Sequence, residues 1–156
     1  MACAGWSDGT CGGSDLLDPQ VAWGCYGMLI FGADGLAIGD GEANTADIIA
    51  DCAYAGIAAR IAGDSSLGGQ DDWFLPSRGE LNALCKWAFN DNRNEVCNNN
   101  GDGGRVLTNG GFHPGAYQSS SEISMDSMWG QGFNNGNYIG DLKRLPGNLV
   151  RPVRAF

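Results

Sequence analysis

The chain has 156 residues, 26 of them glycine, and a formal net charge of -9. This length fits one domain, and a hydrophobic content of 43% argues against disorder. With 17% charged residues, the composition predicts a loop-rich globular domain. Because phosphate contacts need clustered Lys and Arg, the acidic charge argues against nucleic acid as a partner and against a polybasic membrane anchor.

The excess of acidic over basic residues lies in the first part of the chain. Residues 1–116 hold fifteen acidic and five basic side chains, whereas residues 117–156 hold three acidic and four basic ones. No apolar run approaches the roughly 18 residues of a membrane-spanning helix. The opening MACAGWSDGTCGG also lacks the basic and apolar regions of a signal peptide. We therefore expect no membrane insertion, and an export signal or carrier domain outside this sequence stays an open alternative.

The first predicted elements are a strand and a long helix. Residues 21–35, VAWGCYGMLIFGADG, predict a strand that ends in a turn, because β-prone apolar residues precede Ala-Asp-Gly. Residues 44–63 predict one helix that Asn44 or Thr45 caps and Gly63 ends. Its apolar side chains fall on one broad face: Ile48, Ile49, Cys52, Ala53, Ile57 and Ile61.

A second helix and several short strands follow. In LPSRGELNALCKWAF, residues 75–89, Ser77 and Glu80 form a capping box that predicts a helix start. After an Asn- and Gly-rich loop at residues 90–104, short strands are predicted near Arg105–Thr108, Tyr117–Ser121, Met128–Phe133, Tyr138–Leu142 and Leu149–Phe156. Two helices followed by a small antiparallel sheet make an α+β domain that spans residues 1–156.

Six cysteines, none in a Cys-x-x-Cys pair, predict disulfides and an oxidising compartment rather than a zinc site. Proximity in the sequence favours pairing Cys3 with Cys11 and Cys85 with Cys97, which leaves Cys25 with Cys52. Buried free thiols are the alternative.

The sequence holds little that predicts catalysis. The single histidine, His113, lies in a turn-like stretch, where a solvated loop residue is expected. The serines at 119–121 have no evident base, and Asp71 and Asp72 would point to opposite sides of an extended backbone. We expect a protein that is not an enzyme and has no catalytic residue.

One pattern is related to a calcium loop. Asn98, Asn100 and Asp102 occupy positions one, three and five, with Gly103 at six, but Asn109 stands where a bidentate glutamate is required. Two neutral amides and one carboxylate attract calcium weakly, so an ordinary glycine turn is favoured. We expect no cofactor, with a structural calcium ion as the alternative.

Several motifs occur together and in order: IGDGEANTADIIADC, GGQDDWFLPSRGELNAL, GGFHPGAYQSSSE, MWGQGF, NNGN and VRPVRAF. Over residues 38–156 they closely resemble the bacterial and phage domains of the DUF1566 type, which are C-type-lectin-like domains related in fold to formylglycine-generating enzymes. The resemblance implies a C-type-lectin-like fold whose terminal strands meet, with two helices around a small antiparallel sheet. Residues 1–37 would supply the N-terminal strand and a disulfide-bearing segment.

In several such proteins the last third is the variable region of a diversity-generating retroelement, in which error-prone reverse transcription at template adenines changes chosen codons. Residual asparagines among unrelated residues in 117–148 fit partial randomisation of this kind. A fixed frame of Trp129, Gln131, Phe133, Gly136 and Lys143 would then carry a variable ligand-binding surface within residues 117–156. The resemblance implies these ligand contacts: Tyr117, Gln118, Ile123, Ser124, Met125, Asp126, Ser127, Gly130, Gly132, Asn134, Asn137, Tyr138, Ile139, Asp141, Leu142, Arg144, Leu145 and Asn148.

The chain also departs from related families in ways that limit what can be transferred. It lacks the EPN, QPD and WND motifs of calcium-dependent lectins, and it has no cysteine after Cys97 to match the reactive pair of formylglycine-generating enzymes. We expect an extracellular binding domain, at a cell surface or phage tail, whose partner is a protein or other macromolecule on a target cell. A polysaccharide-binding adhesin of fixed specificity is the alternative, and an oxidase of the formylglycine-generating type is the third hypothesis.

Overall fold

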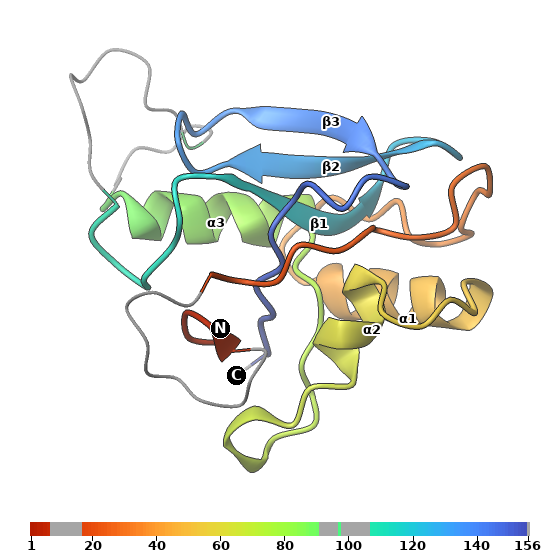
Figure 1. The fold of residues 1–156 in the computed structure, drawn as a ribbon, viewed down its shortest axis with the longest axis horizontal. Coiled ribbons are helices and arrows are strands. Elements are labelled where there is room, and N and C mark those ends of the chain that lie inside the picture. The colour runs from red at the N-terminus through yellow and green to blue at the C-terminus, as the bar shows by residue number, and fades with distance from the viewer. Residues whose placement is uncertain (7–16, 91–96, 98–106, 156) are drawn as a thin grey trace.

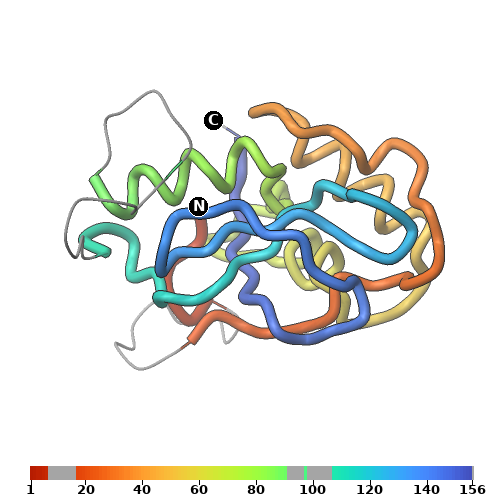
Figure 2. Tube along the Cα trace, turned by 90° about the horizontal axis from the view of Figure 1, so that it is seen from above, coloured from red at the N-terminus to blue at the C-terminus, as the bar shows by residue number. Residues whose placement is uncertain are grey.

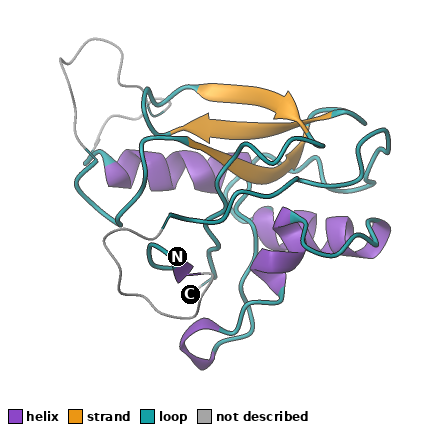
Figure 3. Cartoon of the chain, viewed as in Figure 1, coloured by secondary structure: helices purple, strands orange, loops and turns teal. Residues whose placement is uncertain are grey.

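The computed structural model describes residues 1–6, 17–90, 97 and 107–155. In these ranges three α-helices and a short 3-10 helix precede three strands (Figures 1 and 3). Their bounds are α1 Gly41–Asp51, α2 Ala58–Gly63, η2 Leu67–Gly69, α3 Arg78–Ala88, β1 Ala116–Glu122, β2 Ser127–Gly132 and β3 Tyr138–Leu142. The predicted α+β class is confirmed.

The three strands form one antiparallel sheet in the order β1-β2-β3. Tyr117 lies opposite Gln131, and Trp129 lies opposite Gly140. All three were predicted from the sequence, β3 with its observed bounds. Because neighbours run in opposite directions, the β1–β2 turn and the segment after β3 lie at the same end of the sheet, and the β2–β3 turn lies at the other end.

Two further predicted strands do not appear as strands among the residues that the structure describes. In the segment near 105–108, residues 105 and 106 lie outside the described ranges, and Leu107 and Thr108 belong to no strand. The C-terminal segment forms only isolated bridges, Leu149 with Gln20 and Tyr117, and Val153 with Phe74. This segment therefore connects parts of the domain without extending the sheet.

The strand predicted within residues 21–35 is wrong. Its apolar residues Trp23 and Ile30 are buried, but the backbone takes positive φ at Gly24 (111°), Cys25 (46°) and Gly27 (83°). A strand cannot hold these angles, so residues 21–35 form a loop. Of the N-terminal strand expected within residues 1–37, the described residues 1–6 and 17–37 show only the isolated bridge at Gln20.

The helix predicted over residues 44–63 is broken in two. Helix α1 begins at Gly41 and ends at Asp51, and Cys52 is extended (φ -111°, ψ 101°). Gly56 has φ 74°, which separates α1 from α2. Neither predicted cap acts as one: the Asn44 amide donates to the Gly35 carbonyl at 2.8 Å, and the Thr45 hydroxyl donates to the Gly41 carbonyl at 2.7 Å.

Helix α3 begins as its capping box predicts. The Glu80 N–H donates to the Ser77 hydroxyl at 3.2 Å, and the Ser77 N–H donates to a Glu80 carboxylate oxygen at 2.8 Å. Leu81, Cys85 and Ala88 are buried at the predicted helical spacing. The helix packs against β1 and β2, while α1 packs against β1.

Two predicted disulfides are present. Cys25 pairs with Cys52 and Cys85 with Cys97, with Cα atoms 5.8 and 5.9 Å apart. The third predicted pair involves Cys11, which lies outside the described ranges. Among the helices described here, none has the length and apolar character needed to cross a membrane.

The N-terminal and C-terminal segments meet, as the two ends of the trace show in Figures 1 and 2. The Ala2 N–H donates to the Pro152 carbonyl at 2.8 Å. Arg151, 1% exposed, pairs with Asp18 at 2.6 Å and also donates to the Gly110 carbonyl. Burial raises the pKa of Asp18, and the Arg151 guanidinium acts in the opposite direction. Asp18 also accepts the Tyr117 hydroxyl of β1, and Arg151 donates to the Ala2 carbonyl, so this buried pair joins the sheet to both ends of the chain.

Candidate ligand-binding surface

The most exposed predicted contacts lie at one end of the sheet. In the β1–β2 turn, Ile123 is 42% and Met125 51% exposed. After β3, Arg144 is exposed and Leu145 is 44% exposed. The strand directions place these two turns side by side, as Figures 1 and 2 show.

The remaining predicted contacts are distributed along the strands and at the far end. Asn134 is exposed and Asn137 is half-buried in the β2–β3 turn, at the opposite end of the sheet from Met125. The other half-buried members of the set lie beside the β1–β2 turn or along the edge strand β3: Ser124, Asp126, Ser127, Tyr138, Ile139, Asp141 and Leu142. The structure therefore does not gather the whole predicted set into one patch.

A loop that the sequence pattern did not predict to be exposed lies against the β1–β2 turn. The Gly27 N–H donates to the Met125 carbonyl at 2.9 Å, and the Arg144 guanidinium lies 4.9 Å from the Tyr26 ring centroid. We call the combined exposed surface the apolar end, defined by Tyr26, Met28, Leu29, Phe31, Ile123, Met125 and Leu145. Its loop contribution reaches 83% exposure at Phe31. The sequence feature that could have indicated this exposed loop is the set of glycines at 24, 27 and 32, which interrupt an otherwise apolar run.

A buried ion pair supports the apolar end. The side chains of Lys143 and Glu122 pair at 0% and 3% exposure. The Lys143 ammonium also donates to the Met28 carbonyl at 2.7 Å, and the Glu122 carboxylate accepts the Ile30 N–H at 3.0 Å. Burial lowers the pKa of Lys143, and the hydrogen bond to Glu122 opposes that shift. One ion pair thus joins loop 26–31 to the sheet.

Backbone contacts complete this support. The Gly24 N–H donates to the Lys143 carbonyl at 3.1 Å, and the Lys143 N–H donates to the Asp126 carbonyl at 3.0 Å. The disulfide between Cys25 and Cys52 ties the start of the same loop to the end of α1. The exposed apolar side chains therefore stand on a backbone that is held from several sides.

Five predicted contacts are buried, two of them glycines, and the three that carry side chains do not belong to the candidate surface. Tyr117 is 0% exposed: its hydroxyl donates to Asp18 at 2.9 Å, and its ring centroid lies 4.6 Å from that of Phe133. Burial raises the pKa of the Tyr117 hydroxyl. The amide of Gln118, 1% exposed, donates to the Asn148 carbonyl at 3.2 Å, and Asn148 is itself 4% exposed. The Asn148 side-chain amide donates to the Asp141 carboxylate at 3.0 Å. All three side chains are therefore buried with partners inside the protein and do not face a ligand.

The two predicted glycine positions differ from each other. A Cβ atom on Gly130 would lie 2.7 Å from the Tyr117 carbonyl oxygen, which belongs to the backbone and cannot turn aside. A Cβ atom on Gly132 would lie 2.5 Å from the side-chain oxygen of Asn135, which can rotate. Gly130 is therefore corrected from a variable position to a structural one.

Most of the fixed frame lies beneath the surface. Gln131 and Phe133 are 0% exposed, and the Gln131 amide donates to the Gly136 carbonyl. Trp129 is half-buried, with the Arg78 guanidinium 4.9 Å from its ring centroid. The Arg78 guanidinium also lies 4.8 Å from the ring centroid of Tyr138.

The residues first considered for catalysis have structural contacts or lie at the surface. His113 is exposed, and the Ser119 and Ser121 hydroxyls donate to the Trp129 and Gly35 carbonyls at 2.7 and 2.6 Å. The residues described hold no group of three side chains suited to a metal ion. The calcium-loop pattern at 98–103 lies outside the described ranges.

Comparison with known proteins finds no match among family models, curated proteins or solved structures.

Proposed function

We propose that the protein is a non-enzymatic binding domain that recognises a protein on a target cell through the apolar end. The observation that carries this proposal is the gathering of exposed apolar side chains from two distant segments, loop 26–31 and the β1–β2 turn. Soluble proteins rarely expose large contiguous apolar patches, and such patches mark interaction surfaces. Aromatic residues and Met are also enriched where proteins meet.

A fixed backbone makes this surface suitable for tight binding. A loop ordered before the partner arrives loses little conformational entropy on association. Here the Lys143–Glu122 pair and the disulfide of Cys25 hold the loop in place. The Tyr26 ring then offers contact area without a large ordering cost.

The proposal includes a C-type-lectin-like fold and retroelement diversification, both resting on the motif resemblance. The division between exposed and buried positions supports diversification. Side chains at Ile123, Met125 and Leu145 are exposed, whereas Gln131 and Lys143 of the fixed frame are buried and hydrogen-bonded. Codon changes at the exposed positions would alter the ligand while leaving the fold in place.

Protein arrays test the binding role. The wild-type domain is compared with a triple variant of the apolar end, Met28→Ser/Leu29→Ser/Met125→Ser, and with a control variant, Leu17→Ser/Tyr54→Ser, that changes exposed residues elsewhere. We expect a wild-type protein target whose binding falls at least about tenfold in the triple variant, as for central interface residues. The control variant should bind like wild type. Equal binding by the triple variant would exclude the apolar end as the contact surface.

The coding DNA tests diversification separately. A near-copy template and a reverse transcriptase gene should lie close to the coding sequence. Sibling proteins should differ at Ile123, Met125 and Leu145 but keep Gly130 and Lys143. Absence of the template and the reverse transcriptase removes diversification and leaves the binding role intact.

The location proposed is extracellular, at a cell surface or phage tail. The pairs Cys25–Cys52 and Cys85–Cys97 form and persist in oxidising environments.

Polysaccharide binding is a second candidate, favoured by the aromatic cluster on the sheet. Trp129 and Tyr138 are half-buried with ring centroids 6.2 Å apart, and Arg78 contacts both rings. A glycan array with and without calcium tests it. Binding that Trp129→Ala abolishes and the triple variant of the apolar end retains would favour this function over protein recognition.

A further inference from the structure

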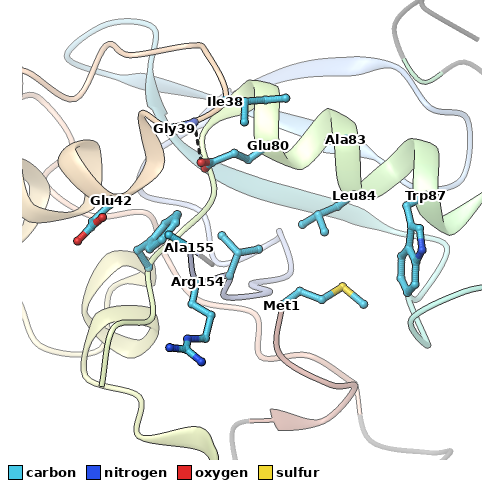
Figure 4. Close-up of a pocket in the computed structure, with 12 residues that line it drawn as sticks. Met1, Ile38, Gly39, Glu42, Glu80, Ala83, Leu84, Trp87, Arg154 and Ala155 are labelled. Atoms are coloured by element: carbon cyan, nitrogen blue, oxygen red, sulfur yellow. Dashed lines mark hydrogen bonds between the residues drawn. The ribbon is translucent and has the colours of Figure 1, made fainter. Parts of the chain in front are cut away.

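A recess with a volume of about 580 Å³ lies away from the apolar end (Figure 4). It is bounded by α3, by residues 38–42 and by the C-terminal segment. None of its lining residues belongs to the apolar end. Its volume falls within the roughly 300 to 1,000 Å³ of typical small-molecule sites. The recess is therefore large enough to hold a small organic molecule.

The walls of the recess are mainly apolar. Leu84 and Trp87 project from α3 toward the opening (Figure 4). Val153 of the C-terminal segment and its bridge partner Phe74 also line the recess. Trp87 is 47% exposed, and Ile38 at the rim is 72% exposed. Such walls favour the transfer of an apolar group from water.

The charged side chains that line the recess differ in whether an opposite charge neutralises them. Glu80 accepts N–H groups of Gly39 and Ser77 at 2.9 and 2.8 Å, and both donors are neutral. Glu42 is exposed and forms no ion pair with any residue of the described ranges. Two carboxylates at one side of the recess thus carry negative charge without a cationic partner.

The one basic side chain in the lining is already paired. Arg154 donates to both carboxylate oxygens of Asp72, at 2.7 and 2.8 Å. Figure 4 shows its guanidinium directed away from the labelled side chains of α3. Its charge is balanced by Asp72. Met1 also lines the recess, and burial lowers the pKa of its α-amino group. Two carboxylates against this one amino group leave the described lining with a net negative charge.

We propose that this recess binds a small apolar molecule that carries one cationic amino group. The ring or alkyl part lies against Leu84 and Trp87, and the ammonium lies near Glu42 and Glu80. This site is independent of the proposed protein-binding surface. Failure of either proposal leaves the other unaffected.

Three probes of matched shape test the site: 3-phenylpropylamine, 3-phenylpropan-1-ol and 3-phenylpropionate. Each is titrated into the ¹⁵N-labelled protein, with the indole N–H of Trp87 as the reporter. We expect saturable shifts at Trp87 and neighbouring α3 amides, with affinity in the order amine, alcohol, carboxylate. No saturable binding of the amine, equal affinity for all three probes, or shifts confined to the apolar end would overturn the proposal.

Charge-removing variants separate the two carboxylates from the apolar walls. The variants are Glu42→Gln and Glu80→Gln, which remove the charge and keep the size of the side chain. Gln at position 80 still completes the capping box with Ser77. We expect each variant to weaken amine binding about two- to fivefold, the range of exposed ion pairs, and to leave alcohol binding unchanged. Unchanged amine affinity in both variants would contradict the assigned role of the carboxylates.

The last test fills the recess with a larger side chain. Ala83 is exposed on α3 and lines the recess, so Ala83→Trp should occupy it without disturbing the core. Ala46→Trp on α1, also exposed but outside the lining, is the matched control. With native thermal unfolding in both variants, only Ala83→Trp should lose amine binding. Wild-type affinity in Ala83→Trp would place the amine elsewhere.

Discussion

Within residues 117–148, buried positions and exposed positions lie within a few residues of each other. Gln131, Phe133 and Lys143 are fully buried. The Gln131 amide donates to the Gly136 carbonyl in the adjacent turn, and the Lys143 ammonium donates to the Met28 carbonyl. Met125 and Leu145, a few residues away, are about half exposed. The contrast shows how one sheet can keep its shape while the side chains at its end change identity.

The largest expected effect comes from breaking the buried ion pair. Lys143→Met leaves the Glu122 carboxylate buried without its cation, which should cost about 3 to 5 kcal/mol of unfolding free energy. Lys143→Met/Glu122→Gln should cost less, because no uncompensated charge remains. Urea unfolding of both variants measures the difference. A single variant as stable as wild type would show that the pair does not hold the loop.

Removing one disulfide should separate the loop from the rest of the domain. Cys25→Ser/Cys52→Ser opens a link of sequence separation 27 and should cost about 3.5 kcal/mol by loop entropy. Hydrogen exchange at the Gly27 amide should accelerate. The control Cys85→Ser/Cys97→Ser, with separation 12, should cost about 3 kcal/mol and leave exchange at Gly27 unchanged. Faster exchange at Gly27 in the control would contradict local anchoring.

Two glycines test the boundary between fixed and variable positions. Gly130→Ala forces a Cβ atom against the Tyr117 carbonyl and should cost about 1 to 3 kcal/mol, as overpacking does. Gly140→Ala meets only the end of the Ile123 side chain at 3.2 Å, so its stability should stay within about 0.5 kcal/mol of wild type. Thermal unfolding compares the two. Equal losses would contradict the assignment of Gly130 as a structural position.

The smallest effect concerns an exposed ion pair outside this region. The hydrogen bond from Arg154 lowers the pKa of Asp72. Because the folded-state pKa is depressed, the pair's contribution to stability is present above the unfolded pKa of about 3.9 and is lost as pH falls through the folded pKa. NMR titration of the Asp72 carboxyl should show the lowered pKa, and Arg154→Gln should raise it toward the usual value. Arg144→Gln is the control and should leave it unchanged.

Local signals account for the elements that could be predicted from the sequence. The capping box of Ser77 and Glu80 lies within one helical turn, and the strands β1, β2 and β3 follow one another in the sequence and pair in that order. The disulfide Cys85–Cys97 joins residues 12 apart. In each case the determining partners are close in sequence.

Long-range contacts account for the elements that could not be predicted. Loop 26–31 has strand-like composition, but its path depends on Lys143, 115 residues from its partner Met28. Asn is a residue type common at helix caps, yet the Asn44 amide contacts Ser120, 76 residues away. No local pattern contains these pairings.

The candidate surface shows the same limit. Exposure at Ile123 and Met125 agrees with the turn between two predicted strands. The Tyr117 hydroxyl is buried where it donates a hydrogen bond to Asp18, 99 residues away in the sequence. The sequence around residues 117 and 118 does not indicate this contact. The exposed loop residues, including Phe31, became part of the surface only through contacts between distant segments.

Two displayed libraries test the central claim most directly. One randomises exposed positions of the last third, Ile123, Met125, Asn134, Arg144 and Leu145, and the other randomises buried ones, Tyr117, Gln118, Gln131, Phe133, Lys143 and Asn148. Both are sorted for resistance to protease on the cell surface. We predict that most members of the first library survive and that few of the second do. Similar survival of the two libraries would contradict a fixed frame beneath a replaceable surface.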